Sequence, residues 1–296
     1  MIIANLTGGL GNQMFEYAAG RALALQNSTN LKLHFTNALV STKRVYSLDV
    51  FNVNAQIATD DEVKLFRYPT SRIGYAFKRV LQELKLYHNS HIYSEKAWYT
   101  YDSGLLKCHD NVYIEGFWQN PRYFNAVAPQ IRKDFTLKSK PNIKNKNLIN
   151  VMGKQNAVSI HIRRGDYVKK IRSGNYFPPL SVEYYRNAII QIIKRVKNPT
   201  FYVFSDDIGW SIQNLNLKNA VFIDHNGNAP VEDLRLMSHC KHHIIANSAF
   251  SWWGSWLNPN EKKVIIGPNK WSSLPYKEGI IQRDWITLDP HFAKPQ

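Results

Sequence analysis

Glycines and amide side chains gather close to the amino terminus, in the run Gly8–Gln13 (Gly-Gly-Leu-Gly-Asn-Gln). The run lies between an apolar stretch and an alanine-rich stretch of helical period, which together predict a strand, a loop and a helix. Glycines let the backbone approach a ligand closely, and a helix amino terminus favours an anion. Gly9, Gly11 and the amides of Asn12 and Gln13 are therefore candidate ligand-binding groups. The alternative is a tight turn without a ligand, since the run is neither a Walker A loop nor a dinucleotide fingerprint.

Charged side chains follow an apolar strand in the segment His161–Asp166 (His-Ile-Arg-Arg-Gly-Asp). Alternation along the strand puts His161 and Arg163 on one side and turns Arg164 elsewhere. An arginine at the carboxyl end of a parallel strand suits a diphosphate, whose oxygens match the planar guanidinium. Asp166 would hold an arginine in place or contact a sugar hydroxyl. The alternative is an ion-pair cluster with a purely structural role.

A third segment, Phe204–Asp207 (Phe-Ser-Asp-Asp), also runs from a strand into polar residues. The carboxylate of Asp206 would accept hydrogen bonds from the edge of a guanine base. Alternatively, Asp206 and Asp207 cap the helix that begins at Ile208. Paired aspartates also raise the question of metal binding. Metal sites on nucleotide sugars often use Asp-x-Asp, which this sequence lacks, so we expect no metal site.

Small hydroxyl residues and tryptophans make up the fourth segment, Asn247–Trp256 (Asn-Ser-Ala-Phe-Ser-Trp-Trp-Gly-Ser-Trp). It follows a strand and is expected to begin a helix. Ser248 and the amides from Ala249 onward would form a phosphate cradle at that helix start. The plain alternative for Ser248 is a helix cap. The tryptophans are expected to pack against the sheet.

The elements that must position these segments alternate between strands and helices. The predicted strands are 1–6, 31–35, 157–162, 200–205, 220–224, 242–247 and 263–267, and the predicted helices reach Gln26, lie within 60–87, run from Ser181 to about Lys194, and begin at Val231 and Ser248. Such alternation predicts parallel sheets covered on both faces. Ligands of these sheets bind at the carboxyl ends of the strands, where all four segments lie.

One change of composition divides the chain. Residues 138–147 are polar and basic, carry a proline and show no apolar period, so they are interpreted as a linker. The total of 296 residues is comfortable for two lobes. We therefore expect an amino-terminal lobe over 1–140 and a carboxyl-terminal, ligand-binding lobe over 150–296.

The bulk composition limits the classes of protein that fit. The formal net charge of +16 suits nucleic acid, an anionic membrane surface or a small polyanionic ligand. No RNP motif, zinc-finger spacing or basic zipper accompanies the charge, so specific nucleic-acid recognition is not expected. Two cysteines, Cys108 and Cys240, give no disulfide framework. No signal peptide or membrane span is visible, so a cytoplasmic protein is expected, with peripheral contact to an anionic membrane.

The four segments together resemble the bacterial α-1,2-fucosyltransferases (glycosyltransferase family 11). The blocks GGLGNQMFEYAAGRALA, HIRRGDY and NSAFSWWGSWLNP look like signatures of that family, and the resemblance runs from Gly8 to about Trp271. The element His-x-Arg-Arg-x-Asp is also similar to one in α-1,6- and protein O-fucosyltransferases. The resemblance implies an α/β GT-B-type fold of two Rossmann-like lobes facing a cleft, GDP-fucose as donor, and no metal.

The resemblance also implies roles for individual residues. Arg163 would grip the GDP diphosphate and stabilise it as it leaves, and His161 would contribute to the nucleotide pocket. Asp206 would contact guanine, Ser248 and its neighbouring amides would bind phosphate, and Asn12 would approach the diphosphate or the sugar from the amino-terminal lobe. The family's animal members are anchored in a membrane at the amino terminus. This chain shows no such anchor, which points to a bacterial cytosol, peripheral to the inner membrane.

The chemistry of such a transfer restricts the mechanism. GDP-β-L-fucose giving an α-linked product means inversion, and therefore one displacement without a covalent sugar–enzyme intermediate. The acceptor expected from the family is the 2-hydroxyl of a β-galactoside, in an oligosaccharide or a lipid-linked glycan of surface polysaccharide (O-antigen) synthesis. Asp166 and Glu16 are candidate bases for that hydroxyl, and late proton transfer to the leaving phosphate needs neither. The alternatives are a transferase for another GDP-sugar and a basic nucleic-acid-binding protein.

Overall fold

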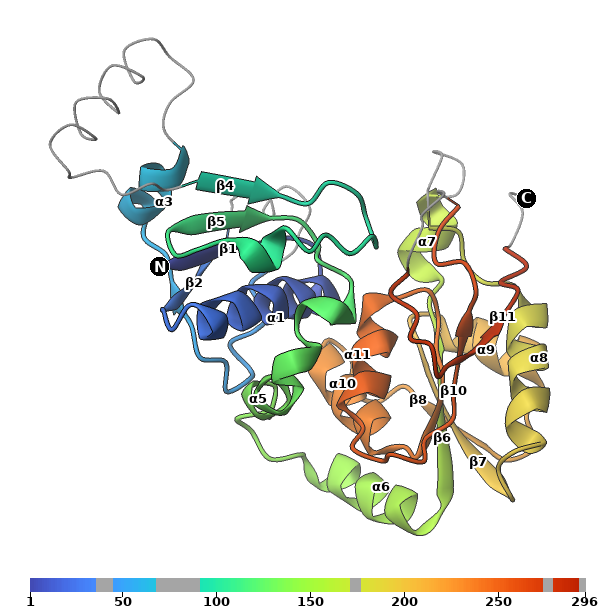
Figure 1. The fold of residues 1–296 in the computed structure, drawn as a ribbon. Coiled ribbons are helices and arrows are strands. Elements are labelled where there is room, and N and C mark those ends of the chain that lie inside the picture. Colours follow the sequence, from blue (N-terminus) through green and yellow to red (C-terminus); the bar gives the residue numbers. More distant parts are fainter. Residues whose placement is uncertain (36–44, 68–90, 171–176, 274–278, 293–296) are drawn as a thin grey trace, which may run out of the picture. The chain divides into compact units, whose positions relative to one another are not determined.

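The computed structural model describes residues 1–35, 45–67, 91–170, 177–273 and 279–292 (Figure 1). The chain divides into two compact units. The first comprises Met1–Lys138 and Tyr276–Ile280, and the second comprises Ser139–Pro275 and Ile281–Gln296. Each unit has its own parallel sheet, so the expected two α/β lobes, each built on a parallel sheet, are confirmed.

The first unit is a five-stranded parallel sheet in the order β3-β2-β1-β5-β4. Its strands are β1 (Ile2–Leu6), β2 (Leu31–Phe35), β3 (Gln56–Ile57), β4 (His91–Ser94) and β5 (Val112–Glu115). Its α-helices are α1 (Leu10–Gln26), α3 (Asp60–Arg67) and α5 (Ala128–Asp134), and its 3₁₀ turns are η1 (Leu105–Lys107), η2 (Pro121–Tyr123) and η3 (Asn125–Val127). The central strand β1 is apolar except for Asn5 and almost entirely buried, which fits its position between β2 and β5.

Helix α1 is the buried helix of this unit. It begins immediately after Gly9, and Gly8 before it has a φ of +68°, a conformation that side-chain-bearing residues rarely adopt. Farther along the helix, Tyr17 and Arg21 both donate to the buried carboxylate of Asp134, at 2.7 and 3.0 Å, and so tie α1 to α5. The glycine-rich turn therefore fixes the start of α1, and the bonds to Asp134 fix its middle.

The second unit is a six-stranded parallel sheet in the order β11-β10-β9-β6-β7-β8. Its strands are β6 (Asn156–Ile162), β7 (Pro199–Ser205), β8 (Ala220–Ile223), β9 (His242–Ile244), β10 (Ile265–Pro268) and β11 (Ile286–Leu288). Its helices are α6 (Ile143–Lys154), α7 (Gly165–Lys170), α8 (Val182–Ile193), α9 (Ile208–Leu215), α10 (Pro230–His239) and α11 (Ala249–Leu257). Strands β6 and β7 at the centre are buried on both faces, as expected for a sheet covered by helices on each side.

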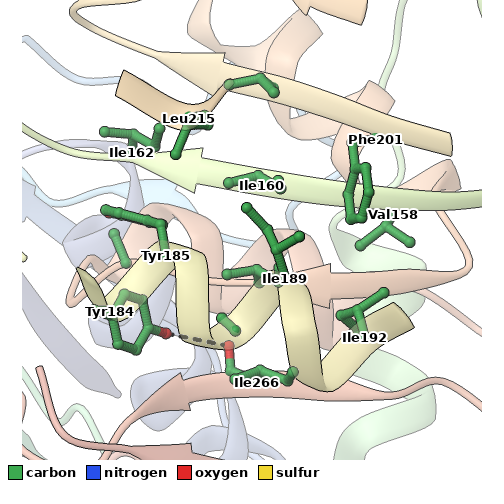
Figure 2. Close-up of a cluster of buried hydrophobic side chains, with 14 of the residues drawn as sticks. Val158, Ile160, Ile162, Tyr184, Tyr185, Ile189, Ile192, Phe201, Leu215 and Ile266 are labelled. Carbon is green, nitrogen blue, oxygen red and sulfur yellow. Dashed lines mark hydrogen bonds between the residues drawn. The ribbon is translucent and has the colours of Figure 1, made fainter. Parts of the chain in front are cut away.

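Alternation along β6 sends its side chains into two different cores. Val158, Ile160 and Ile162 pack with α8 on one face (Figure 2). Ala157 packs on the other face, with residues of α6 and α10. On the α8 side, the hydroxyl of Tyr184 donates to the backbone oxygen of Ile245 at 2.7 Å, so the polar end of this buried ring is satisfied. His161, two alternations beyond Ala157, therefore lies on the α10 and α11 face.

Most of the predicted elements agree with the structure within a few residues. The strand at 31–35 and the helix ending at Gln26 are confirmed, and Ser181 caps α8 by accepting from the Tyr184 amide. The predicted linker is wrong from residue 143 onward, because Asn142 caps α6 there. The helix predicted within 60–87 is α3 up to Arg67, and the rest of that prediction falls outside the described residues.

Candidate functional site

The site in the second unit is centred on Arg163, which immediately follows β6. Its two terminal nitrogens pair with two carboxylates, Nη2 with Asp166 at 2.6 Å and Nη1 with Asp206 at 2.8 Å. The Arg163 side chain is 28% exposed, so its guanidinium is held by the two carboxylates and is still partly accessible to solvent. A guanidinium carries five N–H donors, and two ion pairs leave others available to a ligand. The predicted ion-pair cluster is present, and it fixes the orientation of the arginine.

Asp206 and Asp207 have different roles. Asp206 follows β7, the neighbour of β6, and its second oxygen accepts from the Arg164 backbone amide at 2.8 Å. Both Asp206 oxygens are therefore engaged within the cluster, which favours a positioning role over the expected contact with guanine. Asp207 is the helix cap: it accepts from the Trp210 amide at 3.1 Å and pairs with Arg164 at 3.2 Å. The guanidinium of Arg164 lies 4.0 Å from the centre of the Trp210 ring, so Arg164 is used to fasten β6 to α9.

His161 is 6% exposed and lies in β6, two residues before Arg163. Its ring lies 5.6 Å from the ring of Phe250, in the first turn of α11. Burial lowers the pKa of His161 to about 4, with the charge of Asp206 opposing the shift and that of Arg163 adding to it. The imidazole is therefore neutral at pH 7. Its Nδ1 is buried and has no hydrogen-bond partner among the described residues.

The start of α11 meets the arginine cluster through Tyr167. The Tyr167 ring lies 5.7 Å from the Arg163 guanidinium, and its hydroxyl donates to the Asn247 backbone oxygen at 3.1 Å. Ser248 occupies the N-cap position of α11, yet its side chain makes no capping hydrogen bond, so the plain capping alternative is wrong. The amides of the first turn, beginning with Ala249, point out of the helix start and suit an anion.

Three residues of this site were not identified from the sequence: Tyr167, Asn247 and Phe250. Asn247 is 1% exposed and holds the turn before α11 by donating to Pro178 and Trp271, both at 3.1 Å. Asn247 and Phe250 lie inside a segment that had been singled out, but buried packing contacts between loops have no local signal. Trp252, Trp253 and Trp256 do pack in the interior as predicted, at 5% exposure or less.

In the first unit, the glycine-rich turn uses its two amide side chains differently. Asn12 is partly exposed at the start of α1, and its Oδ1 accepts from Gln119 at 2.8 Å. Gln13 is fully buried and binds the backbone of Gly8, Val45 and Ser47, at 3.2, 2.9 and 2.9 Å. The prediction that Gln13 offers its amide to a ligand is therefore wrong. Gly9 is the N-cap of α1 and Gly11 is buried in its first turn, next to Asn12.

Glu16 does not suit the role of a base for an incoming hydroxyl. It has no exposed surface, and its two oxygens bind Thr7, one accepting from the backbone amide at 2.7 Å and the other bonded to the hydroxyl. Burial raises its pKa well above the usual value, the bonds from Thr7 oppose the shift, and the charge of Glu95 adds to it. We therefore correct its expected role: Glu16 is a buried acid that fastens α1 to the end of β1.

Two absences concern only the part of the chain that the structure describes. Within it, no group of three or more His, Cys, Asp or Glu side chains is placed to hold a metal ion. Within the same residues, no helix is both long enough and apolar enough to cross a membrane.

Comparison with known proteins identifies relatives over the full length. A model of glycosyl transferase family 11 matches residues 1–289. An alpha-1,2-colitosyltransferase of Escherichia coli is 35% identical over 279 residues, which are 92% of this chain and 92% of that protein. The O-antigen biosynthesis glycosyltransferase WbnK of Escherichia coli is 29% identical, over 96% of this chain and 99% of that protein. The galactoside 2-alpha-L-fucosyltransferase Sec1 of Mus musculus is 24% identical, over 100% and 76%.

Solved structures with little sequence identity share the fold. An Arabidopsis thaliana FUT1 mutant in complex with GDP aligns with a TM-score of 0.50 at 11% identity, over 91% of this chain and 71% of that one. POFUT1 in complex with GDP-fucose also aligns with a TM-score of 0.50, at 12% identity, over 89% and 96%. With the two parallel α/β units described above, these likenesses confirm the predicted GT-B-type fold class.

Proposed function

Because the chain belongs to glycosyl transferase family 11, we propose that it is an inverting transferase that moves fucose from GDP-β-L-fucose to the 2-hydroxyl of a β-galactoside. The main observation behind this proposal is the partly exposed guanidinium of Arg163, which forms ion pairs with Asp166 and Asp206 at the carboxyl end of β6. A fixed donor there suits the diphosphate of a nucleotide sugar. Membership of the family supplies the reaction class, and the cluster supplies the donor site.

The GDP end of the donor would occupy the second unit. Arg163 would bind the diphosphate with its remaining N–H groups, Ser248 and the amides from Ala249 onward would bind phosphate oxygens, and neutral His161 would face the nucleotide. Asp166 and Asp206 make no contribution of their own to anion binding, because both are negative. Their contribution is to hold the guanidinium in one orientation, which lowers the cost of ordering it when the donor binds.

Departure of GDP is the step that the cluster would accelerate. As the bond from the anomeric carbon to the β-phosphate oxygen breaks, negative charge collects on the diphosphate. Preorganised donors stabilise such charge without having to reorganise during the reaction. We propose that Arg163 and the helix-start amides supply this stabilisation without a metal ion. In the first unit, Gly9, Gly11 and Asn12 would approach the diphosphate or the reacting sugar of the donor.

The decisive experiment measures fucose transfer and GDP binding separately. We expect acceptor-dependent GDP release from GDP-fucose, over a panel of β-galactosides, to survive EDTA. In Arg163→Ala, turnover should fall by about 10²-fold or more, the loss typical for removal of one transition-state charge donor. Arg186→Ala is the matched control, because Arg186 is an exposed arginine of α8 in the same unit. Equal losses in both variants, or loss of turnover with EDTA, would contradict the proposed donor site.

A second donor deserves the same assay, because the relative with 35% identity is an alpha-1,2-colitosyltransferase. Colitose is L-fucose without its 3-hydroxyl group. A site that hydrogen-bonds a substrate hydroxyl rejects the analogue lacking it by about 10⁴-fold, whereas an apolar site discriminates weakly. The ratio of kcat/KM for the two GDP-sugars therefore decides the donor: a large preference for GDP-fucose supports the proposal, and a preference for GDP-colitose replaces it.

One of the same relatives supports a proposal about the cellular setting. WbnK is named for O-antigen biosynthesis, and we propose that this chain also builds surface polysaccharide, at the cytoplasmic side of the inner membrane. Its acceptor would be a β-galactoside within an oligosaccharide or a lipid-linked glycan. A knockout strain that makes O-antigen with unchanged fucose content would contradict this placement.

A further inference from the structure

The strands of the second unit's sheet all start at one edge, because every pairing in that sheet is parallel. Arg163 lies at the opposite edge, immediately after β6. The register keeps the starts close together: Asn156 of β6 pairs with Pro199 of β7, and Val158 pairs with His242, the first residue of β9. The loops that lead into the strands therefore lie side by side along this edge.

A basic residue precedes each of the six strands by no more than three positions. In the order of the strands from β11 to β8, these residues are Arg283, Lys262, Lys241, Lys154, Lys197 and Lys218. All of them are exposed except Lys241, which is half-buried. Neighbouring strands lie about 4.8 Å apart, so the six positions extend over about 24 Å. We call these six residues the basic row.

Few negative charges oppose the basic row. The loops that lead into the strands contain two carboxylates, Glu261 and Asp284, and three further cations, Lys194, Arg195 and Lys263. At physiological salt a charge acts over about 8 Å, which is more than the spacing of neighbouring strands. The charges therefore add up along the edge, and they suit an extended anionic surface better than a single small anion.

Exposed aliphatic side chains lie at the same edge. Helices α6 and α8 each lead into a strand, so both end there, and Figure 2 shows Ile192 of α8 beside Val158 of β6. Ile193, the last residue of α8, is 56% exposed, and Val151 in the last turn of α6 is 45% exposed. Proteins that lie on a membrane bury such side chains between headgroups and acyl chains. The phosphate backbone of a nucleic acid offers them no apolar layer.

We propose that this edge of the second unit is a docking face for an anionic phospholipid membrane. The basic row binds the headgroups, and Ile193 and Val151 insert beneath them. A bilayer can contact all six loops at once, which a small ligand cannot. The seven residues of β6 span about 23 Å between this face and Arg163. The cluster around Arg163 therefore stays open to solvent while the unit lies on the membrane.

The test neutralises three members of the basic row together, in the combined variant Lys197→Gln, Lys218→Gln and Lys262→Gln. Its partition onto vesicles of equal parts phosphatidylglycerol and phosphatidylcholine is measured by sedimentation at about 0.1 M salt. We expect the partition coefficient to fall by about 10²-fold, because each basic residue near an anionic surface contributes about fivefold.

A second set of three lysines gives a control with the same net charge. Lys140, Lys144 and Lys146 are exposed and lie before and within the start of α6, at the opposite end of that helix from Lys154. Their combined change to glutamine should leave partition within about threefold of the unmodified protein. The thermal midpoint of both variants should stay close to that of the unmodified protein, since all six changes are on the surface.

The apolar part of the face has its own variant. Ile193→Ser should lower partition by about fivefold or more, since insertion buries about half of an isoleucine side chain. Ile143→Ser is the matched control, because Ile143 is 81% exposed at the start of α6, away from the docking face. Ile143→Ser should leave partition unchanged.

Two outcomes would overturn the docking face. Equal losses in the two lysine variants would show that net charge alone, and no particular face, attracts the vesicles. If the change of Lys197, Lys218 and Lys262 abolishes binding to a DNA duplex, while Ile193→Ser has no effect on vesicles, the edge binds nucleic acid instead. No step of the test requires sugar transfer, so the docking face and the proposed function can fail separately.

Discussion

Arg163 combines an observed structural role with the binding role proposed for it. Two carboxylates neutralise it in the absence of a ligand, and each is supplied by a separate element: Asp166 by α7 and Asp206 by the end of β7. The side chain is only partly buried, so the ion pairs are screened by solvent and contribute modestly to stability. Their larger effect is on orientation, because a guanidinium fixed at two nitrogens presents its other N–H groups in a defined direction.

Glu16 gives a prediction about stability at the same scale. Its pKa is raised well above the usual value by burial, so the folded state holds its proton more tightly than the unfolded state does. The stability that this proton provides is complete below the unfolded pKa of about 4.3 and is lost as pH rises toward the raised folded pKa. Glu16→Gln keeps an acceptor and a donor for Thr7 but does not titrate. We expect urea denaturation to show the variant gaining stability relative to the unmodified protein as pH rises above about 4.3.

Glu95 also titrates across this range. It is present in both proteins, so its own contribution largely cancels in the difference, and what remains is its charge coupling to Glu16. A difference in the free energy of unfolding that does not change with pH would show that Glu16 is ionised when buried, in contrast to the direction given by its surroundings.

Individual residues of the candidate site differed in how well the sequence predicted them. His161, Arg163 and Asp166 were identified because alternation along one strand and the turn after it are local properties. The role of Asp206 depends on β7 lying beside β6, and no pattern within either strand contains that pairing.

At the scale of elements, two serines at helix starts provide a matched pair. Ser181 caps α8 by accepting from the Tyr184 amide at 3.2 Å, whereas Ser248 occupies the same position before α11 without a capping bond. We expect Ser181→Ala to lower the free energy of unfolding by about 1 kcal/mol, the usual effect of losing an N-cap. Ser248→Ala should change it by less than about 0.5 kcal/mol and instead weaken GDP binding. Chemical denaturation and calorimetric titration of both variants check this.

The reverse outcome has a clear meaning. If Ser248→Ala destabilises the protein as much as Ser181→Ala and leaves GDP binding unchanged, Ser248 is a structural cap in solution and the phosphate cradle must be sought elsewhere. Tyr184 below Ser181 keeps its own hydrogen bond to Ile245, so the Ser181 variant tests the cap alone.

Elements with a clear apolar period were predictable, and short or polar ones were not. The strands β6 and β7 are continuous apolar runs, and α1 is an alanine-rich helix, so each has a strong local signal. Helix α6 was interpreted as part of a linker because its first turn is polar, and it is fixed by the Asn142 cap and by packing against α10. Strands β3 and β4 are short and largely exposed, so only their pairing with β2 and β5 defines them.

For the whole molecule, the dominant property is the net charge of +16 on 296 residues. The cluster around Arg163 accounts for none of this excess, since it contains more carboxylates than arginines. The positive charge must therefore act over the molecular surface as a long-range attraction for anions, rather than at the proposed donor site. A lipid-linked acceptor at an anionic membrane would bring the enzyme under this attraction.

That argument gives a prediction about membranes. Vesicles containing an anionic phospholipid should sediment with the protein at about 0.01 M salt, where charge acts over about 30 Å, and release it at about 1 M, where the range is about 3 Å. Vesicles of phosphatidylcholine alone should bind little at either concentration, because each basic residue near an anionic surface contributes about 1 kcal/mol only while that surface is charged. Equal binding to both kinds of vesicle would mean that apolar insertion, rather than charge, holds the protein at the membrane. If the protein does not bind anionic vesicles at low salt, its excess positive charge does not act at membranes. Attraction of the anionic donor in solution then remains as the role of that charge.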